Sequence, residues 1–122
     1  MKIHGREVEF RRTVDANCKI DKLTGGNWDQ YFAGIDGYAA GQMFSARFMS
    51  ALSEGAEDAK VFEIEGYEKH PLTVQEALTL DDETFGALFN EALEVWRGEK
   101  PTIEAKPIPS KKKAVKAAEK SV

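Results

Sequence analysis

The fold is decided by residues 82–97, DETFGALFNEALEVWR, whose large apolar residues recur at the spacing of one helix face. That face carries Phe85, Leu88, Phe89, Leu93 and Trp96, with Ala92 between them. Asp81 or Asp82 can cap the start of this helix, and Gly98 can supply a left-handed stop before Pro101. The face holds no histidine, cysteine or carboxylate pair. Because a helix of four turns cannot cover such a stripe alone, we expect the preceding residues to pack on it.

The composition is that of an ordinary globular chain. A length of 122 residues predicts one domain, and 42% hydrophobic with 31% charged residues excludes a wholly disordered profile. No apolar run is long enough to span a membrane, and no signal peptide opens the sequence, so we expect no membrane partner. Cys18 is the only cysteine, which excludes an internal disulfide and fits a reducing cytosol. We expect Cys18 to be a small buried hydrophobe.

Charge is divided unevenly between a body, residues 1–98, and a tail, residues 99–122. The tail has seven lysines and three glutamates, which leaves ten basic and eighteen acidic side chains in the body. A body with this acidic excess is a poor surface for nucleic acid. Three of the four prolines lie in the tail, and we expect it to be disordered. Its lysines Lys111, Lys112 and Lys113 could still touch phosphates, so a small adaptor or regulatory protein with a basic tail contacting nucleic acid is the alternative function.

The first 13 residues predict a β-hairpin, because apolar and polar residues alternate about the turn at His4-Gly5. One face of the hairpin would carry Ile3, Val8 and Phe10. Thr13 is a suitable N-cap for a helix that continues through Leu23 and ends at Gly25-Gly26.

The segment from Gly25 to Gly41 is rich in glycine and contains three aromatic residues, Trp28, Tyr31 and Phe32. Two interpretations of these aromatics remain open. They either plug the core or form an exposed recognition patch.

Helical spacing returns over residues 38–52, and Ser53-Glu54-Gly55 then predicts a break. Residues 56–66 fit either a short helix or a strand, and we favour the helix. Thr73 with Glu76 forms a capping box that begins a helix through Leu80. The sequence therefore predicts a mainly α (α+β) fold: a small helical domain, residues 1–98, with an N-terminal β-hairpin and a disordered C-terminal tail.

Motifs for chemistry are missing from the sequence. It has no zinc-binding cysteine or histidine pattern, no lysine-bearing phosphate loop and no dinucleotide-binding glycine spacing. His70 precedes a proline and is expected in a loop. We therefore predict no catalytic residue, no cofactor and no metal site, and we expect a protein that is not an enzyme.

The body resembles the tail assembly chaperones of long-tailed, siphovirus-type bacteriophages. The resemblance is carried by the N-terminal hairpin MKIHGREVEFRRT, the helix TVDANCKIDKL directly after it and a helical middle. It continues through the closing section, in which L-T-x-x-E-A-L and an acidic turn precede the long helix ending near Trp96. The chain length, the acidic body and the lysine-bearing tail also look like that family.

The resemblance implies a function in protein–protein interaction. Such chaperones bind the long helical tape measure protein in the host bacterial cytoplasm, keep it soluble, promote tail tube assembly around it and are absent from the mature virion. The expected partners are the tape measure protein and the tail tube protein, with possible self-association. Recognition would place apolar anchors of a helix against an apolar face, and we expect Trp28, Tyr31 and Phe32 to provide that face. The family also often makes a longer form by ribosomal frameshifting, for which Lys111, Lys112 and Lys113 are candidate codons.

Overall fold

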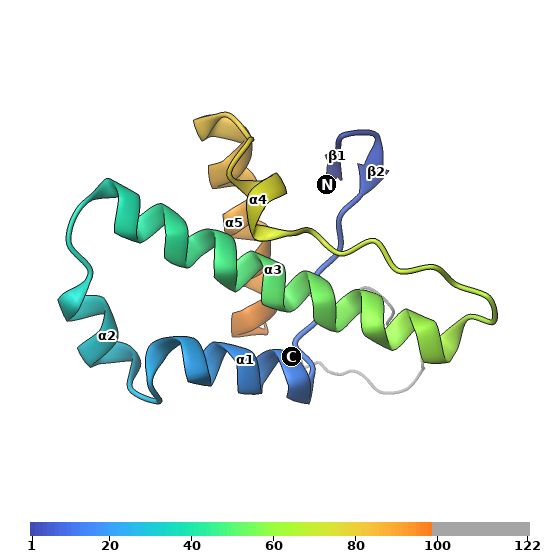
Figure 1. Cartoon of the computed structure of the whole chain (residues 1–122), viewed down its shortest axis with the longest axis horizontal. Coiled ribbons are helices and arrows are strands. Elements are labelled where there is room, and N and C mark those ends of the chain that lie inside the picture. Colours follow the sequence, from blue (N-terminus) through green and yellow to red (C-terminus); the bar gives the residue numbers. More distant parts are fainter. Residues whose placement is uncertain (99–122) are drawn as a thin grey trace.

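The structure, a computed structural model, describes residues 1–98 (Figure 1). This part of the chain is mainly helical, with a short N-terminal hairpin, as the sequence predicts. The predictions made for residues 99–122, including disorder and the frameshift lysines, lie outside the described residues. The elements in chain order are β1 (Lys2–Ile3), β2 (Arg6–Glu7), α1 (Val14–Thr24), α2 (Trp28–Gly34), α3 (Tyr38–Glu63), α4 (Val74–Ala77) and α5 (Asp82–Arg97).

The long helix α3 is the centre of the molecule. Figure 1 shows α1 running below α3 in the opposite direction, with α5 crossing behind α3 at a steep angle. α1, α4 and α5 all contact α3. As a result, α3 is buried on nearly every side along its middle, from Phe44 to Glu57. None of the helices within residues 1–98 combines the length and the apolar character needed to cross a membrane.

The strands of the N-terminal hairpin are shorter than the alternating pattern of the first 13 residues predicts. Lys2 pairs with Glu7 and Ile3 with Arg6, and the turn residues His4 and Gly5 both have positive φ, 50° and 82°. Two consecutive residues with positive φ match the twist of paired strands, which suits a two-residue hairpin turn. The predicted apolar face is confirmed, since all three of its members are buried: Ile3, Val8 and Phe10.

The first helix begins and ends as the sequence predicts. The Thr13 hydroxyl accepts a hydrogen bond from the Ala16 amide at 3.1 Å, and Gly25 ends the helix with φ of 71°. The prediction for Cys18 is wrong, because its side chain is exposed. The buried positions of α1 are Ala16, Ile20 and Thr24. Cys18 lies two residues from Ala16 and from Ile20, about 200° around the helix.

α3 is longer than predicted. The expected break at residues 53–55 does not occur, and the helix interpretation of residues 56–66 is confirmed as far as Glu63. Gly55 does not form a turn; it allows another segment of the chain to pack closely against the helix. A Cβ atom there would lie 2.8 Å from both the Arg11 carbonyl oxygen and the Thr13 hydroxyl. The missing side chain lets the segment between the hairpin and α1 lie directly on the helix, and the Arg11 amide donates to the Leu52 carbonyl at 3.1 Å.

The capping box before α4 forms only in part. The Thr73 hydroxyl accepts from the Glu76 amide at 3.0 Å, but the Glu76 carboxylate turns away to bind Arg6. The prediction that this helix continues through Leu80 is wrong. The helix ends at Ala77, and residues 78–80 form a turn.

α5 has the predicted bounds. Asp81 accepts from the Thr84 amide at 2.7 Å, and Gly98 ends the helix with φ of 78°. Its buried residues are Phe85, Leu88, Ala92 and Val95. The other members of the predicted stripe are partly buried against the core: Phe89, Leu93 and Trp96. Val95 is a core residue that the stripe did not include.

Candidate partner-binding surface

The three aromatic residues favoured by the sequence lie on α2, a short helix capped by the Asn27 side chain. Trp28 packs into an aromatic cluster, with its ring centroid 5.3 Å from Trp96 and 6.1 Å from Phe48. Trp28 and Tyr31 are partly buried against the core, whereas Phe32 is 43% exposed. Trp28 and Tyr31 thus join the core, whereas Phe32 packs on the edge of the same aromatic cluster, with its ring centroid 5.2 Å from Trp28, and also reaches the surface. Their role in binding a partner stays a prediction.

An open pocket lies beside Trp28, with a volume of about 390 Å³. It lies between α1, the start of α2 and the end of α5, and is lined by Arg12, Asn17, Cys18, Asp21, Trp28 and Trp96. The Arg12 guanidinium stands 3.7 Å from the centroid of the Trp96 ring, a cation–π arrangement. It also donates hydrogen bonds to Asn17 Oδ1 at 2.9 Å and to the Trp96 carbonyl at 2.5 Å. These contacts hold one wall of the pocket in place.

A second group of exposed apolar side chains lies around the end of α3. We name it the α3 end patch; it consists of Val61, Phe62 and Ile64, which are 42%, 92% and 49% exposed. Phe62 follows Gly55 by seven residues and Phe48 by fourteen, so all three lie on one side of the helix. The segment before α1 covers that side at Gly55. Phe62 lies about 10 Å further along the helix axis, where this segment no longer covers the helix.

The sequence prediction missed the α3 end patch because it placed a break at residues 53–55. Without that break, the seven-residue spacing of Phe48, Gly55 and Phe62 is visible in the sequence as one continuous helix face. The spacing gives the side of the helix but not the point at which its cover ends.

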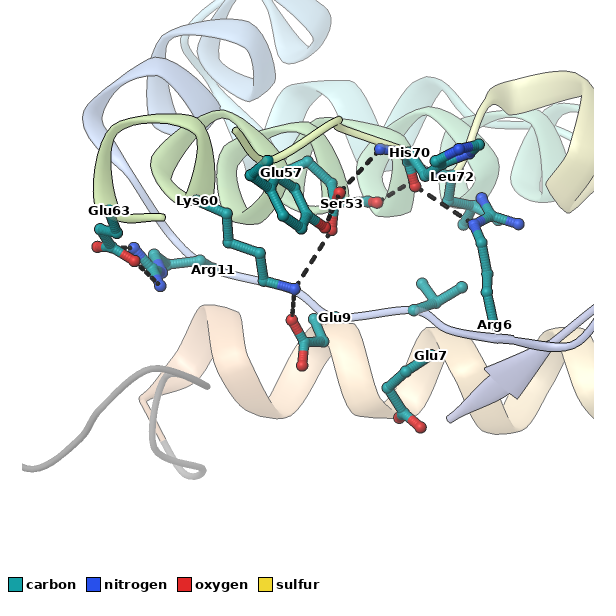
Figure 2. A network of polar contacts seen from close by, with 12 residues as sticks. Arg6, Glu7, Glu9, Arg11, Ser53, Glu57, Lys60, Glu63, His70 and Leu72 are labelled. Carbon is teal, nitrogen blue, oxygen red and sulfur yellow. Dashed lines mark hydrogen bonds and ion pairs between the residues drawn. The ribbon is translucent and has the colours of Figure 1, made fainter. Parts of the chain in front are cut away.

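Polar contacts hold the end of α3 and the segment after it in a fixed arrangement (Figure 2). Arg11 donates to Glu63 at 2.8 Å, and Lys60 forms an ion pair with Glu9. Lys60 also donates to the buried Glu57 carboxylate at 3.5 Å (Figure 2). That carboxylate accepts as well from the Tyr67 hydroxyl at 2.5 Å and from the His70 amide at 2.8 Å.

Two further contacts fix residues 70–76. The Leu72 amide donates to the Ser53 hydroxyl at 2.7 Å. Arg6 binds both carboxylate oxygens of Glu76, at 2.6 and 2.7 Å, and also donates to the Pro71 carbonyl. We call the contacts of Glu57, Ser53, Glu76 and the N-terminal arginines the polar clamp. The clamp presents the α3 end patch on a firmly held scaffold.

The clamp shifts the ionisation of its acids. Burial alone would raise the pKa of Glu57, but the His70 amide and the Tyr67 hydroxyl outweigh burial and hold that pKa below its usual value. The Arg6 hydrogen bonds, assisted by His4, lower the pKa of Glu76 from 4.5 to about 2. Both carboxylates are thus charged at neutral pH and bind neighbouring groups of the fold.

The described residues offer little for chemistry. In residues 1–98 no three histidine, cysteine or acidic side chains gather closely enough to hold a metal ion. The shifted acids Glu57 and Glu76 are committed to hydrogen bonds within the clamp. What the surface does offer is exposed apolar side chains at the α3 end patch and at Phe32. Comparison of the chain with protein-family models, with curated proteins and with solved structures finds no match.

Proposed function

We propose that this protein is a tail assembly chaperone that binds the phage tape measure protein, keeps it soluble in the host bacterial cytoplasm and promotes tail tube assembly. It acts by binding and carries out no reaction. The observation that carries the proposal is the α3 end patch, in which Phe62 continues a core helix face and is 92% exposed. The resemblance in the order of hairpin and helices supplies the identity of the partner.

A helix is the partner that the patch suits best. Burial of an exposed phenylalanine side chain contributes about 1.5–3 kcal/mol, so Phe62 by itself can supply a large part of a weak binding free energy. A partner helix with apolar residues three and four positions apart would pack beside Phe62 and extend the side-by-side packing of α1 on α3. Glu65 directly follows Ile64 and is exposed, which favours a partner with basic residues beside its apolar stripe.

Co-expression with the tape measure protein tests the proposal. The full chain should keep the tape measure protein in the soluble fraction, and Phe62→Ser should weaken binding by about 10- to 100-fold, the equivalent of one lost aromatic anchor. Leu78→Ser is the matched control, since Leu78 is 39% exposed but lies after α4 and outside the patch. An insoluble tape measure protein with the full chain would overturn the proposal.

The same experiment can examine α2, whose aromatic residues the sequence analysis expects to bind the partner. Phe32→Ser removes the aromatic side chain of α2 that is most available, while leaving Trp28 and Tyr31 in the core. Loss of solubility with Phe32→Ser and not with Phe62→Ser would assign binding to α2. Retention of DNA in place of the tape measure protein, released as salt rises, would instead favour the adaptor function.

A further inference from the structure

The short helix α2 is attached to the rest of the molecule through apolar side chains. Within the part of the chain that the structure describes, its hydrogen bonds stay inside residues 27–35, such as the bond from the Gln30 amide to the Asn27 side chain. No residue of α2 itself is buried. The other short helix, α4, is held differently, because Arg6 binds both carboxylate oxygens of Glu76. Movement of α2 would therefore break no polar contact with another element.

Glycine residues flank α2 on both sides. Gly26 precedes it with φ of 84°, and Gly37 follows it with φ of 93°. Figure 1 shows α2 at one end of the molecule, joined to α1 and to α3 by loops. Small residues at the ends of an element can absorb the backbone rotations of a hinge, so the two connections allow α2 to leave the body as a unit.

The apolar residues of α2 have the spacing of a helix that binds in an apolar site. Trp28, Tyr31, Phe32 and Ile35 stand at offsets of 0, 3, 4 and 7 along the chain. An amphipathic helix uses the same offsets for the anchors that it places against a partner protein. Trp28, Tyr31 and Ile35 are partly buried against the core, as such anchors would be.

These side chains lie on an aromatic floor, which we define as Phe44 and Phe48 of α3 with Trp96 of α5. The Trp28 ring centroid lies 5.9 Å from that of Phe44, 6.1 Å from that of Phe48 and 5.3 Å from that of Trp96. The Arg12 guanidinium also packs on the Trp96 ring and donates to the Trp96 carbonyl. Arg12 belongs to the segment before α1, so this part of the floor is held in place independently of α2.

We propose that α2 occupies a helix-binding site of its own chain, and that an amphipathic partner helix with apolar residues at the same spacing displaces it from the aromatic floor. Exposure of the floor and of the α2 side chains to water is unfavourable, so α2 stays in place until a partner buries the same surface. Its short connections give α2 an effective concentration in the millimolar range, so a partner helix must fit the floor well to compete. The site is separate from the α3 end patch and does not depend on the proposed function.

A synthetic peptide with the sequence of residues 26–37, GNWDQYFAGIDG, tests the proposal. The chain is isotope-labelled and the peptide is not, so the NMR signal of the Trp96 indole N–H reports whether the peptide reaches the floor. Trp28→Ser removes one anchor and leaves the floor free more often, so this variant should bind the peptide about tenfold more tightly than the unchanged chain does. If α2 were itself the surface that contacts a partner, the same substitution would not strengthen binding.

Matched controls separate displacement from nonspecific binding. A peptide with serine in place of its three aromatic residues should leave the Trp96 signal unchanged. Val14→Ser alters a side chain that is 78% exposed on α1, and this variant should bind the peptide as the unchanged chain does. Phe32→Ser removes a less buried anchor and should strengthen binding about threefold. It carries the test if circular dichroism shows that Trp28→Ser is unfolded.

Two outcomes would overturn the proposal. Equal affinity of the peptide for the unchanged chain and for the α2 variants would show that α2 does not compete for the site. A Trp96 signal that stays in place as the peptide is added would show that the floor does not accept a helix from outside.

Discussion

Phe48 and Phe62 lie on the same side of the same helix, fourteen residues apart, and their environments are opposite. Phe48 is fully buried, with four aromatic rings within about 6 Å, while Phe62 is 92% exposed. α1, α4 and α5 contact α3, and Figure 1 shows that the end of α3 extends past both α1 and α5. The difference shows that an apolar stripe determines which side of a helix is covered. The lengths of the neighbouring elements determine how far along the helix that cover extends.

Phe48→Ala should have the largest effect on stability. Removing a buried aromatic ring forfeits its transfer free energy and leaves a cavity, so the free energy of unfolding should fall by about 3–5 kcal/mol. Urea denaturation followed by circular dichroism measures this change. Phe62→Ala is the matched variant at the exposed position. A small loss at Phe48 would show that the aromatic cluster repacks and that the middle of α3 is not the centre of the core.

The comparison also shows what the sequence can and cannot predict. α5 was predictable at both ends, because Asp81 and Gly98 cap it through local contacts that depend only on neighbouring residues. The continuity of α3 through Gly55 could not be predicted. A glycine is needed there because Arg11 and Thr13, more than forty residues earlier in the sequence, pack closely against the helix. The exposure of Phe62 depends on where that contact ends.

The candidate site likewise combines a feature that the sequence predicts with contacts that it does not predict. Helix periodicity places Phe62 on the same side of α3 as Phe48, but the polar clamp joins residues far apart in the sequence, such as Arg6 and Glu76. The sequence shows Glu76 only as a capping-box residue, and no local pattern indicates that its carboxylate binds Arg6. Cys18 was misplaced for a related reason: its residue type favours burial, while its position on α1 faces away from α3.

Glu76→Gln should have the second largest effect and should appear mainly as a change with pH. Arg6 lowers the pKa of Glu76 from 4.5 to about 2, so the charged carboxylate stabilises the fold above pH 4.5. That contribution is lost as the pH falls from 4.5 towards 2, because the unfolded state takes up the proton first. The variant should lose about 2 kcal/mol at pH 7 and show a flatter decline in acid. Urea denaturation at several pH values measures both, and an unchanged acid decline would contradict the role of the clamp.

Gly55→Ala should destabilise the protein by about 1 kcal/mol, because crowding against Arg11 and Thr13 exceeds the gain in helix propensity. The control is Gly86→Ala in α5, where a Cβ atom meets nothing within 4 Å and a gain of about 0.5–1 kcal/mol is expected. Opposite signs at the two helix glycines, measured by thermal unfolding, would show that the segment before α1 lies closely on α3 at Gly55. If both substitutions stabilise, the segment before α1 does not lie closely on the helix.

Phe62→Ser should have the smallest effect, within about 0.5 kcal/mol, because a side chain that is 92% exposed loses almost no buried contact. Thermal unfolding of the purified chain measures it. The same substitution that spares the fold should weaken binding of the tape measure protein, and this contrast distinguishes a binding surface from a part of the core. A loss of 1 kcal/mol or more in the isolated protein would show that Phe62 is covered in solution. The two phenylalanines of α3 would then differ in what covers them, and the α3 end patch would be unavailable to a partner.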